Sequence, residues 1–419
     1  MSGTLTPPGG GHHTFARRFV HDERRRLTDI ESVVQGQSWT IRYGYYDNGL
    51  LKHIADSERF GRQWAYDAAG RLTLADSYYL LPDGQVNPGG QLRYAYHKNS
   101  ALASVTSGVG VEAYTYKGRR HHTLEGINGP QGSLALTHDA DGNRCSVTVT
   151  GAGGTGATHY RWTGDGLLSS VQSGSAVTAF EYDHTGSRWR RLRPDGAAVL
   201  MLDGLVELEG GTLKKHLRLP GAICTVTGKT GARCAHRDRL HPARVHDQSG
   251  KLLHNIGYMP YGGQIVLQGD ETSQFGFNGK ERELASGLLH FGARYYDPVT
   301  RQFISVDPLL MQGAGHLVLR PEVLHPYTFA ASNPTSNFEE DGTYPWGILG
   351  YVAEYRRLRA SHGPKAGHIV GYNFVIDTFH TFVPGADALR GVMFGQTHFE
   401  ARRGEAGSGR AINAVRLGG

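Results

Sequence analysis

Residues Asn278–Pro308 have the sequence NGKERELASGLLHFGARYYDPVTRQFISVDP. Gly287–Tyr296 is a short run of apolar and aromatic residues, and Asp297-Pro298 ends it. Gln302–Ser305 is a second short run, which leads into another Asp-Pro pair at Asp307-Pro308. Apolar and aromatic runs bounded by Gly and Pro are typical of β-strands. The stretch therefore predicts two short strands whose aromatic side chains are buried.

A second pattern recurs along the first half of the chain. It consists of Tyr-Asp or a similar pair, then a Gly turn and an apolar pair, and most copies begin 20 to 24 residues after the previous one. The copies begin at Tyr46, Tyr66, Tyr96, Tyr116, His138, Trp162 and Tyr182. Tyr and the alternating apolar residues supply one strand face, Asp begins the turn, and Gly supplies the positive φ that closes it. Each copy therefore predicts one β-hairpin.

A single hairpin cannot bury its apolar face, so neighbouring hairpins must pair into a long, twisted sheet. The content of 59 Gly, 21 Tyr and 15 Phe in 419 residues favours many tight turns between aromatic strands. We expect a mainly β fold with almost only antiparallel strands from about Tyr43 to Val306. Its hairpin turns are expected at Asn48-Gly49, Asp141-Gly142 and Thr185-Gly186.

These residues resemble the RHS/YD-repeat family. Asn278–Pro308 is similar to the RHS-associated core of bacterial polymorphic toxins and of toxin-complex C subunits, and Leu240–Lys251 and Tyr258–Gly263 resemble the family segments that precede it. In that family the repeats wind into a hollow cocoon, which implies a partial cocoon shell here with the core as a plug. The core-motif residues are Gly292, Arg294, Tyr295, Tyr296, Asp297 and Pro298.

We divide the chain into four parts. Residues 1–38 are expected to be a flexible N-terminal segment, 39–270 the hairpin shell, 271–345 the RHS-associated core, and 346–419 a variable, mostly α-helical tail that resembles pretoxin segments. The first paired strand is expected near Trp39–Tyr46. Because its outer edge would be open, we expect the isolated chain not to be a closed container and to pair with a second YD-repeat chain or an upstream part.

The resemblance also implies a candidate reaction. Some relatives cut themselves behind the core by aspartyl proteolysis, in which two carboxylates share a proton and activate water. Asp307 matches the first family aspartate, and the second candidate is Asp341. The implied scissile region is Thr343, Tyr344 and Pro345. Asp-Pro and Asp-Gly are also frequent turn sequences, so a purely structural plug is the alternative.

Three functions follow from these observations. The first is a shell that encloses and presents its C-terminal effector segment in toxin delivery or bacterial competition, with a cognate immunity protein as a further partner. The second is an autoprotease that releases an active toxin, and the third is a cell-surface protein that binds carbohydrate. The histidines of the tail have no metal-binding or nuclease spacing, so the toxin activity of the tail is not identifiable. No cofactor or metal is expected.

Composition excludes several other classes. The net charge of +6 is spread along the chain, so binding of nucleic acid by the whole body is not implied. The three cysteines have no CxxC or metal-like spacing, so we expect buried thiols and no disulfide framework. No Sec signal peptide and no run of 18 apolar residues are present. The expected location is secreted or cell-surface by a non-Sec route, otherwise cytoplasmic before delivery.

Overall fold

The computed structural model describes residues 2–5, 13–57, 60–80, 86–118, 122–202, 204–219, 221–228, 231–269, 274–308, 325–339 and 345–346. These residues form β-strands and two three-residue 3-10 turns, η1 (Phe277–Gly279) and η3 (Ala330–Ser332). The expected mainly antiparallel β fold is confirmed. Within the described part of the chain, no helix has the length and apolar character needed to cross a membrane. The expected helices of the tail lie outside the described residues.

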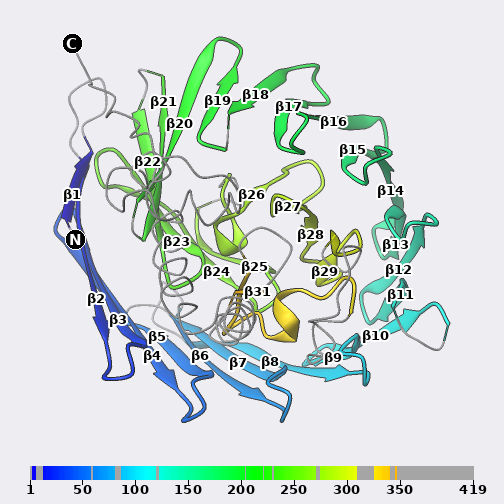
Figure 1. Ribbon diagram of the computed structural model, residues 1–419. Helices are drawn as coiled ribbons and strands as arrows, with labels where there is room; N and C mark the ends of the chain where they lie inside the picture. Colours follow the sequence, from blue (N-terminus) through cyan, green and yellow to red (C-terminus); the bar gives the residue numbers. More distant parts are fainter. Residues whose placement is uncertain are drawn as a thin grey trace, which may run out of the picture.

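One antiparallel sheet contains 25 strands, and each strand pairs with its neighbours in sequence. Figure 1 shows that this sheet curves round the short strands of the core. Its strands are β1 (Ser2–Leu5), β2 (His13–His21), β3 (Leu27–Val34), β4 (Gln37–Tyr45), β5 (Leu51–Asp56), β6 (Phe60–Tyr66), β7 (Leu72–Leu80), β8 (Val86–Tyr96), β9 (Leu102–Ser107), β10 (Gly110–Tyr116), β11 (Leu124–Gly129), β12 (Gly132–His138), β13 (Arg144–Gly151), β14 (Gly154–Trp162), β15 (Leu168–Ser173), β16 (Ala176–Tyr182), β17 (Arg188–Leu192), β18 (Ala198–Leu202), β19 (Val206–Glu209), β20 (Thr212–Leu219), β21 (Ala222–Thr227), β22 (Gly231–Arg237), β23 (Pro242–Asp247), β24 (Leu252–Tyr258) and β25 (Gln264–Gln268).

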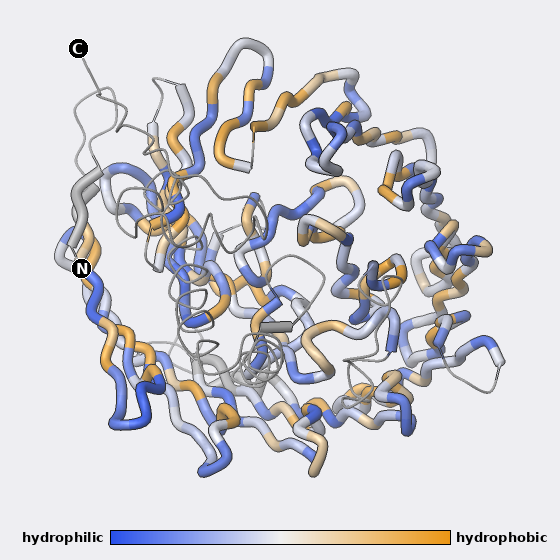
Figure 2. The backbone as a smooth tube through the Cα atoms, viewed as in Figure 1, coloured by the Kyte–Doolittle hydropathy of each residue, from blue (hydrophilic) through white to orange (hydrophobic). Residues whose placement is uncertain are grey.

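The three predicted hairpin turns are confirmed. Gly49, Gly142 and Gly186 have φ angles of 88°, 86° and 82°, in the region that favours Gly. The N–H of each donates to the carbonyl three residues earlier, at 2.9, 3.2 and 3.1 Å. Figure 2 shows apolar and polar residues interspersed along the strands of the sheet, as expected for a sheet with one buried face.

The repeat tyrosines form a hydrogen-bond ladder between neighbouring hairpins. Each donates its hydroxyl to the carbonyl of the residue that follows the turn of the preceding repeat. In the first repeat the equivalent residue is Tyr45 and not the predicted Tyr46, whose hydroxyl donates to Trp64 O at 2.9 Å instead. The pairs are Tyr45 to Leu27 at 2.7 Å, Tyr66 to Leu51 at 2.7 Å, and Tyr96 to Leu72, Tyr116 to Leu102 and Tyr182 to Leu168 at 2.8 Å. Trp162, which replaces Tyr in its repeat, donates its indole N–H to Arg144 O at 2.8 Å. The repeat therefore requires an aromatic residue with a polar tip.

The expected N-terminal boundary is wrong. β2 and β3 pair with each other, and β3 pairs with β4, so the first paired strand is not near Trp39. Alternating apolar residues such as Ile30 and Val34, both 0% exposed, fill the inner face of this segment. The charged residues hid this pattern, because Arg17 is itself buried and donates to the carbonyls of Arg237, at 2.6 Å, and Gly221.

Arg17 belongs to a seam where the two ends of the large sheet meet through side chains. Trp39 of β4 stacks on His246 of β23 with ring centroids 5.8 Å apart. Arg244 of β23 forms two hydrogen bonds with the Asp56 carboxylate of β5, at 2.9 and 3.0 Å. Strands β2, β4 and β5 are therefore fastened to the β21–β23 region by side-chain packing and buried polar contacts.

The expectation of free thiols is wrong for two of the three cysteines. Cys224 and Cys234 form a disulfide, and Cys145 is free and half-buried. Cys224 lies on β21 directly opposite Cys234 on β22, so the hairpin register brings them together. Sequence spacing alone did not indicate this pairing, because it depends on where the hairpin turns.

Candidate functional site

The core forms a small four-stranded sheet inside the curve of the large one (Figure 1). Its strands are β26 (Glu281–Arg282), β27 (Leu289–His290), β28 (Tyr295–Asp297) and β29 (Gln302–Phe303). Tyr295, Tyr296 and Phe303 are 3%, 0% and 0% exposed, so their predicted burial is confirmed. The Tyr296 ring lies 4.3 Å from that of Phe329, centroid to centroid, within a larger aromatic cluster. Aromatic packing thus gives the core an apolar centre.

Asp297 of the core motif fixes both a turn and a contact with the shell. Its carboxylate accepts hydrogen bonds from Val299 N at 2.9 Å and from Thr300 Oγ1 at 2.8 Å. Arg144 on β13 also donates to it, at 2.5 Å, and donates to Thr300 Oγ1 at 2.8 Å. The 25-stranded sheet forms a wall round the core (Figure 1). The Asp-Pro turn of the core is therefore anchored on this wall by the fully buried guanidinium of Arg144.

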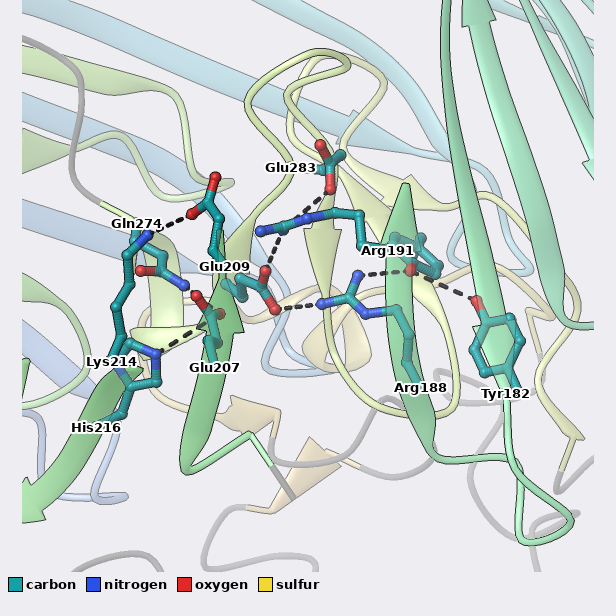
Figure 3. A network of polar contacts seen from close by, with 11 residues as sticks. Tyr182, Arg188, Arg191, Glu207, Glu209, Lys214, His216, Gln274 and Glu283 are labelled. Atoms are coloured by element: carbon teal, nitrogen blue, oxygen red, sulfur yellow. Dashed lines mark hydrogen bonds and ion pairs between the residues drawn. The ribbon is translucent and has the colours of Figure 1, made fainter. Parts of the chain in front are cut away.

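Arg188 and Arg191 of β17 form a second anchor (Figure 3). Arg188 donates to Tyr295 Oη at 2.9 Å and binds the Glu281 carboxylate. Arg191 binds Glu281 at 2.5 Å and Glu283 at 3.3 Å. Since buried charges are costly unless paired, this network fixes how the core sits against the wall.

The two acids of this anchor have opposite pKa shifts. Burial raises the pKa of Glu281, but Arg188 and Arg191 outweigh it, so the net pKa lies below the ordinary value. Burial also raises the pKa of Glu283, and Arg191 offsets this only in part, so its net pKa lies above the ordinary value. Burial, with the charge of Arg188, lowers the pKa of neighbouring His290 to about 3. Opposite shifts in neighbouring acids make this anchor sensitive to pH.

A third contact joins the wall to the beginning of the core (Figure 3). Gln274 Nε2 donates to Glu207 Oε1 of β19 at 2.5 Å, and His216 Nε2 of β20 lies 3.6 Å from the same oxygen. His216 Nδ1 is 3.0 Å from Thr225 Oγ1, which orients the ring. Burial raises the pKa of Glu207, but the hydrogen bond with His216 contributes to a net lowering.

Residues 325–339, which we name the strap, cross several repeat turns of the shell. Tyr327 donates its hydroxyl to Gly142 O at 2.6 Å, and Ser332 Oγ donates to Ser100 O at 3.3 Å. Asn333 Nδ2 donates to Gly70 O at 2.8 Å. The strap thus contacts the turns of three repeats, and each contact joins residues at least 185 positions apart in sequence.

The end of the strap contacts the first repeat and the seam. Leu51 N donates to Ser336 Oγ at 3.1 Å, and Tyr66 Oη lies 2.8 Å from Thr335 Oγ1. Arg239 donates to the carbonyls of Thr335 and Ser336 at 2.9 and 2.8 Å. The strap therefore holds a row of hairpins in fixed relative positions.

The predicted catalytic pair is only partly described. Asp307 forms an ion pair with Arg294 at 2.8 Å, and its N–H donates to Pro326 O at 3.0 Å. The Arg294 guanidinium lies 3.7 Å from the Phe303 ring centroid, so the motif arginine connects Asp307 to the aromatic centre. The other predicted residues, Asp341, Thr343 and Tyr344, lie outside the described residues. Their role with Asp307 stays a prediction.

The chain reappears as a short strand after this gap. β31 (Pro345–Trp346) pairs with β30 (Phe338–Glu339), and Pro345 lies opposite Glu339. Glu339 is 0% exposed, and sequence reasoning did not single it out. Within the described ranges, no group of three or more His, Cys, Asp or Glu side chains is arranged to hold a metal ion.

The wall anchors also escaped sequence reasoning, although a signal was present. In most repeats the aromatic residue pairs, across the turn, with a buried Leu on the next strand. This holds for Tyr45, Tyr66, Tyr96, Tyr116 and Trp162. Arg144 and Arg188 occupy the same register position, opposite His138 and Tyr182. An Arg at a repeat position that otherwise carries buried Leu indicates a buried acidic partner elsewhere in the chain.

Comparison with known proteins identifies relatives among bacterial toxins. The chain is 30% identical over 116 residues to the toxin subunit YenC1 of Yersinia entomophaga, which covers 26% of this chain and 11% of that protein. It is 23% identical over 359 residues to double-stranded DNA deaminase toxin A of Burkholderia cenocepacia, covering 76% and 23%. It is 22% identical over 231 residues to the tRNA3(Ser)-specific nuclease WapA of Bacillus spizizenii, covering 51% and 9%. The chain thus spans less than a quarter of each of these relatives.

The solved structures that the chain resembles include the Photorhabdus luminescens Tc holotoxin pore. The two sequences are 17% identical, the TM-score is 0.42, and the match covers 82% of this chain and 21% of that one. No family model matches the chain. The tyrosine-centred hairpin repeats, the core sequence that they surround and the toxin relatives together make the chain similar to toxin proteins of the RHS/YD-repeat family.

Proposed function

We propose that the chain forms part of a shell that encloses and presents a C-terminal effector segment, residues 346–419, in the delivery of a bacterial toxin or in competition between bacteria. In this proposal the hairpins up to residue 270 are the wall, and residues 271–345 are the core. Two observations support it: the large sheet curves round the core, and the relatives are named as toxins or toxin subunits.

The contacts between core and wall carry the proposal furthest. Arg144 and Arg188 replace the repeat Leu, and each reaches an acid of the core. A repeat array that only had to form a sheet would need Leu at both positions, as in the other repeats. These substitutions therefore suit a wall that holds a particular core, which in turn places the chain that follows.

Trypsin digestion under native conditions tests this function. Exposed Arg24 and Arg25, in the turn between β2 and β3, serve as the internal control and should be cut early. Arg356, Arg357 and Lys365 should be cut only after the shell is denatured. Rapid release of peptides from residues 347–419 out of the folded protein would reject the proposed enclosure.

Self-cleavage is a second candidate. One observation favours it: β31 is held beside β30, directly after the predicted scissile residues Thr343 and Tyr344 and with Pro345 itself paired. The proposed acids are Asp307 and Asp341. Intact-mass measurement of the purified chain should then show a fragment near the last 74 residues (419 − 345), and Asp307→Asn should abolish it. A single uncut species of 45.7 kDa would reject this reaction.

The partners and route belong to the same proposal. The chain would act outside the producing cell after export by a non-Sec route, and a cognate immunity protein would protect the producer. A second YD-repeat chain or an upstream part would pair with the outer edge of β1, because a sheet edge offers backbone groups for pairing. Mixing the purified chain with such a repeat chain should give a stable complex in size-exclusion chromatography.

A further inference from the structure

The strap contains a left-handed turn made of residues other than Gly. Ala330, Ala331 and Ser332 have φ angles of 48°, 52° and 59°. Ser332 N donates to Phe329 O at 2.9 Å and Asn333 N donates to Ala330 O at 3.0 Å, which closes the turn. This conformation costs free energy at each L-residue, and L-residues adopt it singly unless the surroundings impose it. The turn is therefore strained backbone that neighbouring contacts must hold.

Two side chains further along the strap hold Ala330. Its N–H donates to Glu339 Oε2 at 3.2 Å, and Asn337 Nδ2 donates to its carbonyl at 2.9 Å. Ala330 and Glu339 are both 0% exposed, so this contact is shielded from solvent. Directly before the turn, Phe329 is packed against Tyr296 of the core. The beginning of the turn is thus fixed by two side chains of the strap and by the aromatic core.

Glu339 makes a second contact in the opposite direction. Its backbone pairs with Pro345, and Phe338 pairs with Trp346, in the β30–β31 sheet. One buried residue therefore touches the strained turn through its carboxylate and the strand that leads into the tail through its backbone. The aromatic core, the turn, Glu339 and β31 form a continuous series of contacts.

We propose that Glu339 is a positioning residue that couples the strained turn Ala330–Ser332 to β31. Pairing of β30 with β31 keeps the carboxylate in place, and the carboxylate keeps the turn left-handed. When β31 leaves β30, the turn relaxes to ordinary backbone and Phe329 withdraws from Tyr296. Departure of the following chain is in this way transmitted to the core. The inference rests on the proposed presentation of that chain.

The first test measures the strain. Gly adopts positive φ without the steric cost that Ala bears, so Ala331→Gly should raise the melting temperature by about 1–3 °C. Ala69→Gly is the matched control, because Ala69 is also in a turn but has no positive φ. That variant should leave the melting temperature unchanged or lower it. If both variants lower it equally, the turn is not strained and the proposal fails.

The second test measures the coupling by hydrogen exchange of the full chain. Glu339→Ala should speed exchange at least tenfold in peptides covering both 330–333 and 338–346, whereas Glu339→Gln keeps the size and an acceptor oxygen and should stay near the parent. In the Ala331→Gly background, the effect of Glu339→Ala on 330–333 should be smaller. Faster exchange at only one of the two sites, in either Glu339 variant, would overturn the coupling.

The trypsin experiment separates this inference from the proposed function. A protected tail in a protein whose two sites exchange independently overturns the coupling through Glu339 alone. Two coupled sites in a protein whose tail is cut at once overturn the presentation of the tail, and the contact then only stabilises the strap.

Discussion

Arg144 of the wall donates to Asp297 of the core at 2.5 Å, although 153 residues separate them in sequence. Arg144 occupies the register position that buried Leu fills in neighbouring repeats. Arg188 occupies the same register position in the repeat that begins at Tyr182, and it binds Glu281 of the core. The repeat thus supplies a general position on the inner face of the wall, and two Leu-to-Arg differences mark where the core is attached.

Replacing Arg188 by Leu restores the common repeat residue and should nevertheless destabilise the protein. Glu281 would keep Arg191 but lose its other guanidinium, and removing one partner of a buried pair costs about 3 kcal/mol or more. Arg190→Leu on the same strand is the control, because its partner Glu181 is on the surface and such pairs contribute about 1 kcal/mol or less. Urea unfolding should separate the two variants, and equal midpoints would contradict the anchor.

The pH dependence of stability should differ in sign between the two acids of this anchor. The pKa of Glu281 is lower in the folded than in the unfolded protein. Its contribution to the stability of the fold is therefore present above the unfolded pKa, near 4.5, and is lost as the pH falls through the folded pKa. The folded pKa of Glu283 is raised, so its contribution is most favourable below pH 4.5 and declines as pH rises through its folded pKa.

Melting curves from about pH 3.5 to 8 for Glu281→Gln and Glu283→Gln check this prediction. The decrease in melting temperature that Glu281→Gln causes should become smaller toward low pH. The melting temperature of Glu283→Gln should rise relative to that of the parent as the pH rises. Parallel profiles for the two variants would show that the environments of the acids do not differ as described.

The hydrogen-bond ladder predicts that Trp162 can be replaced by Tyr at a smaller loss of stability than by Phe. Trp162→Phe removes the indole donor to Arg144 O and should cost about 1 kcal/mol, the net value of one hydrogen bond. Trp162→Tyr supplies the hydroxyl that other repeats use and should cost less. Equal losses in thermal unfolding would mean that the ring volume, and not the donor, determines this position.

Tyr296 should be the most sensitive aromatic residue of the core motif. It is fully buried between other rings, and truncation of such a residue to Ala typically costs about 3 kcal/mol or more. Tyr296→Phe loses only the hydrogen bond to Tyr261 O, at 2.8 Å, and should cost about 1 kcal/mol. A Tyr296→Ala protein as heat-stable as the parent would contradict this placement.

The sequence was most informative where structure depends on local chemistry. Gly49, Gly142 and Gly186 indicate their turns because only nearby residues determine a positive φ, and Tyr295 and Tyr296 indicate burial through their own apolar surface. The seam was missed because it depends on how far the sheet curves, and the disulfide because it depends on where one hairpin turns. Arg17 lies in the segment predicted to be flexible, and its burial could not be predicted because its partners are backbone carbonyls about 200 residues away.

A double-mutant cycle on Arg144 and Asp297 tests the attachment of the core to the wall most directly. Arg144→Leu and Asp297→Asn should each lower the free energy of unfolding by about 3 kcal/mol, since each leaves a buried partner without its charge. The double variant should cost about 2 kcal/mol less than the sum, the coupling expected of groups in direct contact. Losses that add to within about 0.5 kcal/mol would show that the two residues act independently, and would contradict a core held by the repeat wall.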